Sequence, residues 1–321
     1  MAENASYRKA VVLGAAGFIG VRLAHSLADK GFSVVCFDKI KCSDWPAGAK
    51  AIVGDFAAPP ESLSAELDDC LLFHLVSASQ PSASTSKIGC EIAVDLSGTL
   101  RLLETIASRR LRLIYFSSGG TVYGHNDSDV IPERSATEPI CSYGVMKLTA
   151  ERYVALYGLL HRLDHVIVRP SNPYGPGQSP LQGQGLIAVL LHRALNDQAI
   201  EVWGDGENVR DYIYIDDLAE AAVAAAVSGK NGAIYNIGTG LGHSINQVIA
   251  QVRATLGRPM AVSYAPQRAV DVRRNVLCID RLTTDTEWTP RIGLAEGLKY
   301  TAEWIRHSQK FDMRAGHGGK Y

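Results

Sequence analysis

The feature that most constrains the fold is a glycine-rich turn near the start of the chain. Residues 11–13 form an apolar, strand-like run that leads through Gly14, Gly17 and Gly20 into the amphipathic segment 21–30. Gly14 allows a tight turn, Gly17 lets a pyrophosphate approach the backbone, and Gly20 lets helix and strand pack closely. The pattern therefore predicts a dinucleotide site at the start of the helix.

The spacing is Gly-x-x-Gly-x-x-Gly instead of the more familiar Gly-x-Gly-x-x-Gly, so the next segment decides how to interpret it. Residues 33–38 form a second apolar run that ends in Asp38, 18 positions after Gly20. A carboxylate there accepts hydrogen bonds from both ribose hydroxyls and repels a 2′-phosphate. Asp38 therefore predicts NAD as the cofactor, although a plain turn residue at a strand end is the alternative.

Apolar, strand-like runs alternate with helical patterns as far as residue 170. The runs cover residues 10–13, 34–37, 51–53, 71–76, 113–117 and 166–168. This alternation predicts the α/β class, with a doubly wound parallel sheet of the Rossmann type and ligands outside the carboxyl ends of the strands. Beyond Pro170 the chain becomes rich in Pro and Gly, which indicates a crossing into a smaller C-terminal lobe.

Tyr143 and Lys147 lie four positions apart in the helical segment 142–161. One helical turn places this phenol and ammonium on the same face. A lysine charge close to a tyrosine favours phenolate, so we expect the pKa of Tyr143 to be lowered toward neutral pH and the phenol to act as a general base. Taken alone, the pair is more often a solvated helix face.

Further ordered motifs extend along nearly the whole chain. They lie at residues 73–75, 98–104, 117–124, 169–177, 204–217, 235–240 and 268–271. Together with the glycine turn and the Tyr143/Lys147 pair, they resemble the extended short-chain dehydrogenase/reductase family, and within it the NAD-dependent nucleotide-sugar epimerases. The resemblance implies residues 1–170 as an NAD-binding Rossmann domain with a return segment 209–238, and residues 171–321 as mainly a nucleotide-sugar-binding lobe.

The resemblance also implies a mechanism. Tyr143 would take the proton of the C4 hydroxyl while the hydride goes to NAD, and the transient 4-keto sugar would turn over and be reduced from its other face. Lys147 would hold the nicotinamide ribose and act on the tyrosine. The cofactor contacts that it implies are Gly14, Gly17, Phe18, Ile19, Gly20, Asp38, Asp55 and Lys147.

The segment 117–124 departs from the family pattern. The position that normally supplies an assisting hydroxyl is Gly119, so Thr121, or else Ser118 or a water, must replace it. Family dehydratases carry an acid pair where this chain has Gly120 and Thr121, which favours epimerisation. Asp95 is a further departure, because the family commonly has asparagine there.

The substrate contacts are carried over residue by residue. Asn172 and Arg210 resemble diphosphate-binding residues, and Arg268 and Asp271 resemble the pair at the nucleotide's phosphate and ribose. Asn275 stands where the family places a gate at the C2 substituent of the sugar, and a small side chain there would admit an N-acetyl group. The alternative is that Asn275 simply begins a strand at residues 276–279.

The expected function is therefore 4-epimerisation of UDP-hexoses, UDP-glucose and UDP-galactose and also UDP-N-acetylhexosamines. The alternatives are a nucleotide-sugar dehydratase, another epimerase of the family, or a non-catalytic NAD-binding regulator. Retention of Tyr143, Lys147 and Arg210 favours an enzyme, because a sensor needs only the cofactor site. The resemblance further implies a homodimer formed through residues 88–108 and 142–161.

Composition excludes several other classes of function. With 46% hydrophobic and 20% charged residues among 321, the chain can bury a sizeable core. The net charge of -1 gives no pull toward nucleic acid or an anionic membrane, and no apolar run reaches spanning length, so we expect a cytoplasmic protein. The cysteines and histidines lack metal-ligand spacing, so His74 is expected in the core and no metal is expected. Asp216 and Asp217 are expected to cap a helix.

Overall fold

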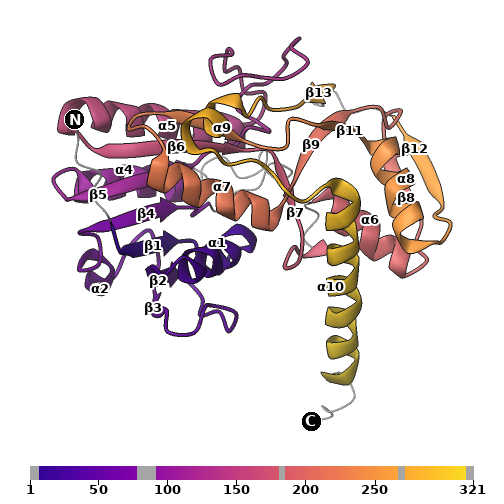
Figure 1. The fold of residues 1–321 in the computed structure, drawn as a ribbon, viewed down its shortest axis with the longest axis horizontal. Coiled ribbons are helices and arrows are strands. Elements are labelled where there is room, and N and C mark those ends of the chain that lie inside the picture. Colours follow the sequence, from indigo (N-terminus) through magenta and orange to yellow (C-terminus); the bar gives the residue numbers. More distant parts are fainter. Residues whose placement is uncertain (1–6, 78–91, 181–184, 267–271, 316–321) are drawn as a thin grey trace.

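The computed structural model describes residues 7–77, 92–180, 185–266 and 272–315, and of residues 93, 94 and 309–315 it describes the backbone alone. Figure 1 shows a central sheet on one side and a smaller group of strands and helices on the other. None of the helices in the described part of the chain is long and apolar enough to cross a membrane.

The central sheet has seven strands in the order β10-β6-β5-β4-β1-β2-β3, and all of the pairings are parallel. This confirms the predicted doubly wound Rossmann sheet. The strands are β1 (Lys9–Leu13), β2 (Ser33–Asp38), β3 (Lys50–Val53), β4 (Cys70–His74), β5 (Leu111–Phe116), β6 (Asp164–Pro170) and β10 (Ile234–Ile237). The strand order reverses between β1 and β4, the place where such sheets bind ligands.

Helices cover both faces of the central sheet, so its strands read as nearly continuous apolar runs. Helices α1 (Phe18–Asp29) and α7 (Ile215–Ser228) pack on one face, where Val12 of β1 meets Leu23 and Leu27 of α1. Helices α2 (Glu61–Ser64), α4 (Ser97–Ile106) and α5 (Ser142–His161) cover the other face. The bounds of α5 are those that the sequence predicted.

The C-terminal region is built around two small sheets. The first has the order β11-β9-β13 with β7 also paired to β9, and the second pairs β12 with β8. Helix α10 packs against α6 and α8 beside them (Figure 1). The elements are β7 (Asn172–Tyr174), α6 (Leu186–Leu195), β8 (Ile200–Trp203), β9 (Val209–Tyr214), β11 (Gly242–Ser244), α8 (Ile245–Leu256), β12 (Val262–Ala265), β13 (Arg274–Asn275), α9 (Asp280–Thr286) and α10 (Leu294–Ala315).

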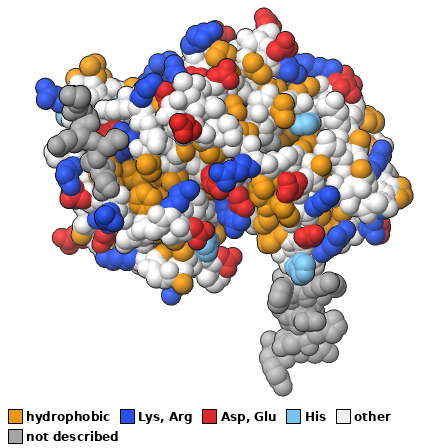
Figure 2. All heavy atoms as spheres, in the orientation of Figure 1, with side chains coloured by type: hydrophobic (Ala, Val, Ile, Leu, Met, Phe, Trp, Pro, Cys, Tyr) orange, Lys and Arg blue, Asp and Glu red, His pale blue; other side chains and the backbone are white. Residues whose placement is uncertain are grey.

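The segment 209–238 contributes to both parts of the structure. Its strand β9 lies at the centre of the smaller sheet, whereas α7 packs on the Rossmann sheet and β10 adds the seventh strand. The division into domains at residue 170 stays a prediction. On the face seen in Figure 2, acidic and basic side chains are interspersed. This face therefore carries no large patch of a single charge, in keeping with the net charge of -1.

Two local predictions were wrong. Asp216 and Asp217 do not cap α7, which has no side-chain cap. Asp216 instead pairs with Arg22 of α1, and the buried Asp217 accepts the backbone N–H groups of Arg291 and Ile292 at 3.0 and 2.8 Å. Both acids therefore join distant segments to α7.

The second error concerns the strand expected at residues 276–279. The strand is instead β13, Arg274–Asn275, so Asn275 lies inside it. The helix predicted over residues 88–108 is described only from residue 92, and there it begins with a π-helical turn, Ile92–Leu96, before α4.

Candidate active site

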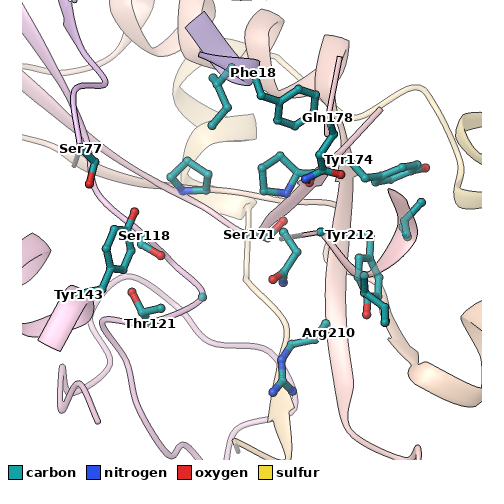
Figure 3. Close-up of a pocket in the computed structure, with 18 of the residues that line it drawn as sticks. Phe18, Ser77, Ser118, Thr121, Tyr143, Ser171, Tyr174, Gln178, Arg210 and Tyr212 are labelled. Atoms are coloured by element: carbon teal, nitrogen blue, oxygen red, sulfur yellow. The ribbon is translucent and has the colours of Figure 1, made fainter. Parts of the chain in front are cut away.

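One cavity of about 780 Å³ opens at the carboxyl ends of the central strands and extends into the smaller lobe. It is lined by the glycine turn, by residues at the ends of β5 and β6, by the start of α5, and by β8 and β9. In Figure 3, Tyr143, Ser118 and Thr121 lie on one side of this cavity, while Tyr212 and Arg210 lie across it. The cavity therefore joins the glycine turn and Lys147 with two of the predicted substrate residues, Asn172 and Arg210, in one space.

The glycine turn needs its glycines for steric reasons. Gly14 has a φ of 86°, and a Cβ on Gly20 would lie 2.1 Å from the carbonyl oxygen of Gly14. Gly17 precedes α1 without any side-chain cap, and Phe18, Ile19 and Gly20 of its first turn line the cavity. The N-terminus of α1 can therefore receive an anion such as a pyrophosphate.

Asp38 ends β2 beside the turn, and its Oδ2 accepts the backbone N–H of Ala16 at 2.9 Å. The carboxylate thus supports the turn as well as standing where a ribose diol would bind. Asp55 is exposed, and its Oδ1 accepts the N–H of Ala57 at 2.8 Å. Among the residues described, the lining of the cavity stops short of both acids, so their contacts to the cofactor stay predictions.

We expect the protein to bind NAD at least about tenfold more tightly than NADP, because the Asp38 carboxylate repels a 2′-phosphate. Asp38→Asn keeps an oxygen for the Ala16 N–H and removes the charge, so it should narrow this preference. Competition binding of the two nucleotides measures the ratio. Asp69→Asn, at the exposed start of β4, serves as the control. Equal binding of both nucleotides by the unaltered protein would show that Asp38 was misinterpreted.

Tyr143 and Lys147 meet as predicted at the start of α5. Lys147 is buried, its Nζ donates to the carbonyl oxygen of Phe116 at 3.0 Å, and it lies 5.7 Å from the centroid of the Tyr143 ring. The expected direction of the tyrosine pKa is wrong, however. Burial, and after it the charge of Asp95, raises the pKa of Tyr143, while burial lowers the pKa of Lys147 to about 8. Desolvation outweighs the nearby lysine.

The structure explains the missing hydroxyl at Gly119. A Cβ there would lie 2.5 Å from Cδ1 of Leu277 and 2.8 Å from the carbonyl oxygen of Arg169, so no side chain fits. Thr121 and Ser118 both line the cavity beside Tyr143 (Figure 3). Oγ1 of Thr121 is buried and has no hydrogen-bond partner within the described part of the chain. A buried hydroxyl of this kind is well suited to bind a ligand.

Thr121→Val should lower turnover at least about tenfold, because it preserves shape but removes the free hydroxyl beside Tyr143. Ser118→Ala is the matched comparison and should have a mild effect. Steady-state kinetics of the two purified variants decides between them. The reverse order of damage would assign the hydroxyl to Ser118, and two mild effects would point to water.

Only some of the predicted substrate residues line the cavity in the described part of the chain. Asn172 and Arg210 line the cavity, with the Asn172 amide donating to the Asp211 carbonyl at 2.9 Å and Arg210 Nη1 donating to the Val209 carbonyl at 2.8 Å. Arg268 and Asp271 lie outside the described residues.

Asn275 does not face the cavity as the predicted gate would. It is 1% exposed, and its amide donates to the Gly119 carbonyl at 3.1 Å. Because β13 pairs with β9 in the register Asn275 to Arg210, the side chain packs under the turn at Gly119. Its placement therefore supports that turn, and a direct contact with the sugar stays a prediction.

Sequence reasoning missed several lining residues, among them Ser77, Gln178, Trp203 and Tyr212. Trp203 is 41% exposed at the end of β8, directly before the motif at residues 204–217. Tyr212 is inside that motif. An exposed tryptophan next to a ligand motif was the available signal, since such rings are good surfaces for stacking.

The residues present fit a dinucleotide. The glycine turn admits no Cβ at Gly20 and leaves the first turn of α1 open to the cavity. The hydroxyls of Ser117, Thr121 and Ser171 are buried along the cavity without a partner in the described part. A Rossmann sheet with this turn, together with a Tyr-Lys pair whose lysine is buried, defines a dinucleotide-dependent enzyme that transfers protons.

Comparison with known proteins agrees with that class. The model of the NAD dependent epimerase/dehydratase family matches residues 10–238. A UDP-glucose 4-epimerase of Mycolicibacterium smegmatis is 31% identical over 314 residues, covering 94% of this chain and all of the relative. The chain therefore belongs to the NAD-dependent epimerase/dehydratase family, and its cofactor is NAD.

Two solved structures extend the comparison. The UDP-glucose 4-epimerase of Thermotoga maritima, with UDP-glucose, has a TM-score of 0.88 at 29% identity and covers 94% of this chain and 99% of its own. The UDP-glucuronic acid 4-epimerase of Bacillus cereus, with UDP-glucuronic acid and NAD, has a TM-score of 0.85 at 26% identity, with coverage of 94% and 99%.

Proposed function

We propose that the protein is a 4-epimerase of UDP-hexoses, with UDP-glucose and UDP-galactose as the first candidates. The observation that carries this proposal is the continuity of one cavity from the glycine turn, past Tyr143 and Lys147, to Asn172 and Arg210. A sugar nucleotide bound along it would bring its hexose to the Tyr143 side. The relatives named for UDP-glucose support the same substrate class.

In the proposed reaction, Tyr143 takes the proton of the C4 hydroxyl and later returns a proton to the same oxygen, after the 4-keto sugar has turned its opposite face to the cofactor. NAD, when bound, supplies the redox chemistry by accepting two electrons from C4 and giving them back. Lys147 holds a positive charge beside the phenol and so stabilises its ionised form. Thr121 donates a hydrogen bond to the reacting oxygen, for which its hydroxyl is available.

On the other side of the cavity, Arg210 and Asn172 are proposed to hold the diphosphate. A guanidinium fork matches phosphate oxygens, and the Asn172 amide lies on the adjacent strand β7. The exposed ring of Trp203 offers a stacking face for the uracil base. These contacts would fix the nucleotide and leave the hexose free to turn over.

The cavity also favours epimerisation over the alternatives. At Gly120 a Cβ would have nothing closer than 3.9 Å, so the position where family dehydratases carry an acid is open space beside Ser118 and Asn172. Elimination would lack its acid and base there. A regulator that only bound NAD would not require a buried lysine beside a tyrosine, which desolvation makes unfavourable.

The test is incubation of the purified protein with a panel of UDP-sugars and separation of the products by chromatography or NMR. The panel holds UDP-glucose, UDP-galactose, UDP-N-acetylglucosamine and UDP-glucuronic acid. We expect interconversion of C4 epimers, without added NAD if the cofactor copurifies. Formation of a 4-keto-6-deoxy product would assign a dehydratase. Tightly bound NAD with no turnover of any sugar would support the regulator.

We also propose a homodimer formed through α5. Its outer face exposes Val145, Tyr153, Leu156, Leu159 and Leu160, and most of these recur at the helical spacing of one side. An apolar stripe of this kind usually marks a protein interface.

Leu156→Glu, at the centre of the stripe on α5, should convert the dimer into a monomer, because a charge would be buried at the interface. Light scattering coupled to gel filtration measures the mass. Leu241→Glu, also exposed but in the loop before β11, is the control and should leave the mass unchanged. A monomeric unaltered protein would contradict the proposal.

A further inference from the structure

The turn that precedes α4 has an unusual geometry near the Tyr143 side of the cavity. Residues Ile92–Leu96 form a π-helical turn that packs against α5, and such turns are frequently found at functional sites. Its backbone is tied to the central sheet. The Thr99 hydroxyl donates to the Asp95 carbonyl at 2.6 Å, and Nε2 of His74 lies 2.8 Å from the same hydroxyl oxygen.

These two contacts fix the tautomer of His74. The Thr99 hydroxyl has one proton and gives it to the Asp95 carbonyl, so Nε2 of His74 must donate to the hydroxyl. Burial lowers the pKa of His74 to about 3, and the ring is therefore neutral. A neutral, buried histidine thus anchors the π-helical turn through Thr99 to the end of β4.

The side chain of Asp95 is connected to the cavity that Tyr143 lines. Oδ2 of Asp95 accepts a hydrogen bond from the Ser77 hydroxyl at 2.8 Å. Ser77 lines the cavity together with Tyr143 and Lys147, and Figure 3 shows it on the Tyr143 side. The carboxylate is therefore held at the edge of the site by a residue that faces the ligand space.

Within the described part of the chain, several further titratable groups lie near Tyr143 and Lys147. The titratable groups of the described residues that face Tyr143 or Lys147 are His74 on β4, Tyr115 on β5, Asp95 on the π-helical turn, Cys141 before α5 and Glu151 on α5. His74 is neutral, and burial raises the pKa of Tyr115, which keeps it protonated. Glu151 accepts two hydrogen bonds from Arg169, and its charge raises the pKa of Lys147 less than that of Asp95 does.

We propose that Asp95 is a positioning residue of the reaction, whose carboxylate keeps Lys147 charged and sets the pH at which Tyr143 exchanges its proton. Burial alone favours neutral lysine, and the Asp95 charge opposes that effect. The same charge disfavours phenolate, so it raises the pKa of Tyr143 and makes the phenolate a stronger base when it takes the proton. This inference rests on the proposed function because it takes Tyr143 as the proton carrier.

Asp95→Asn tests the proposal because an amide oxygen can still accept the Ser77 hydrogen bond while the charge is lost. Without the carboxylate the pKa values of Tyr143 and Lys147 both fall. The pH profile of kcat should therefore move to lower pH by about half to one unit. Asp95→Glu keeps the charge and should restore the original position. Ser77→Ala removes the hydrogen bond alone and should leave the position of the profile unchanged.

A second measurement does not depend on turnover. The ultraviolet absorbance of phenolate is recorded for the NAD-bound protein and for its Tyr143→Phe variant at the same alkaline pH, with and without Asp95→Asn. The difference isolates the signal of Tyr143 among the 13 tyrosines of the chain. Its ionised fraction should be larger in the Asp95→Asn background.

An unmoved pH profile and an unchanged phenolate fraction in Asp95→Asn would overturn the proposal. That failure is distinguishable from failure of the proposed function. If Tyr143→Phe retained full turnover, Tyr143 would not be the proton carrier at all. If Tyr143→Phe is inactive while Asp95→Asn behaves like the unaltered protein, the epimerase assignment stands and only the role of Asp95 falls.

Discussion

Replacing Tyr143 with phenylalanine should lower turnover of the preferred UDP-sugar at least about a hundredfold, the usual scale for loss of a general acid-base group. Phenylalanine keeps the aromatic ring under Nζ of Lys147 and removes only the hydroxyl that exchanges the proton. The fold and the affinity for NAD should therefore be retained. Steady-state kinetics, circular dichroism and nucleotide binding measure the three properties.

The matched control for this substitution is Tyr115→Phe. The Tyr115 ring also lies near Lys147, with its centroid 5.4 Å from Nζ, but it belongs to β5 and is buried in the sheet. Loss of its hydroxyl should leave turnover within about tenfold of the unaltered protein. Comparable turnover in Tyr143→Phe and the unaltered enzyme would remove Tyr143 from the mechanism.

The second large effect concerns stability. Glu151 on α5 and Arg169 on β6 form a fully buried ion pair, with side chains 3% and 2% exposed and hydrogen bonds of 2.6 and 2.9 Å. Glu151→Gln leaves the guanidinium charge buried without a counter-charge. We expect a loss of about 3 to 5 kcal/mol in the free energy of unfolding, measured by urea titration.

Two comparisons make that experiment specific. Glu220→Gln removes one partner of an exposed pair with Arg291, 3.5 Å apart, and should cost less than about 1 kcal/mol. Replacing both buried partners, as Glu151→Leu with Arg169→Met, removes the isolated charge and should cost less than Glu151→Gln alone. Equal losses of unfolding free energy in Glu151→Gln and Glu220→Gln would mean that burial does not increase the cost of breaking the ion pair.

Local sequence patterns were sufficient for the parts of the fold that depend on neighbouring residues. The glycine turn is fixed by sterics within a few residues, because a Cβ on Gly20 would strike the Gly14 carbonyl. Helix α5 has the predicted bounds, and the strands follow the apolar runs to within a few residues. These features place Tyr143 and Lys147 correctly, since one helical turn connects them.

Properties set by distant segments could not be predicted in this way. The roles of Asp216 and Asp217 depend on Arg22 and on residues 291–292, which no local pattern connects to α7. The placement of Asn275 depends on the register between β13 and β9. The pKa of Tyr143 depends on how completely the folded chain covers it, and burial reversed the direction expected from Lys147 alone.

The crowded surroundings of Gly119 limit which side chains this position can accept. A serine at this position would meet the Leu277 side chain, which a smaller residue could relieve, and also the Arg169 carbonyl, which belongs to β6 and cannot be trimmed by mutation. A side chain with a hydroxyl at residue 119 would therefore require the backbone at the end of β6 to move. Without such a movement, the proposed assisting hydroxyl has to come from residue 121, from residue 118 or from a water, and the packing around residue 119 is enough to explain its glycine.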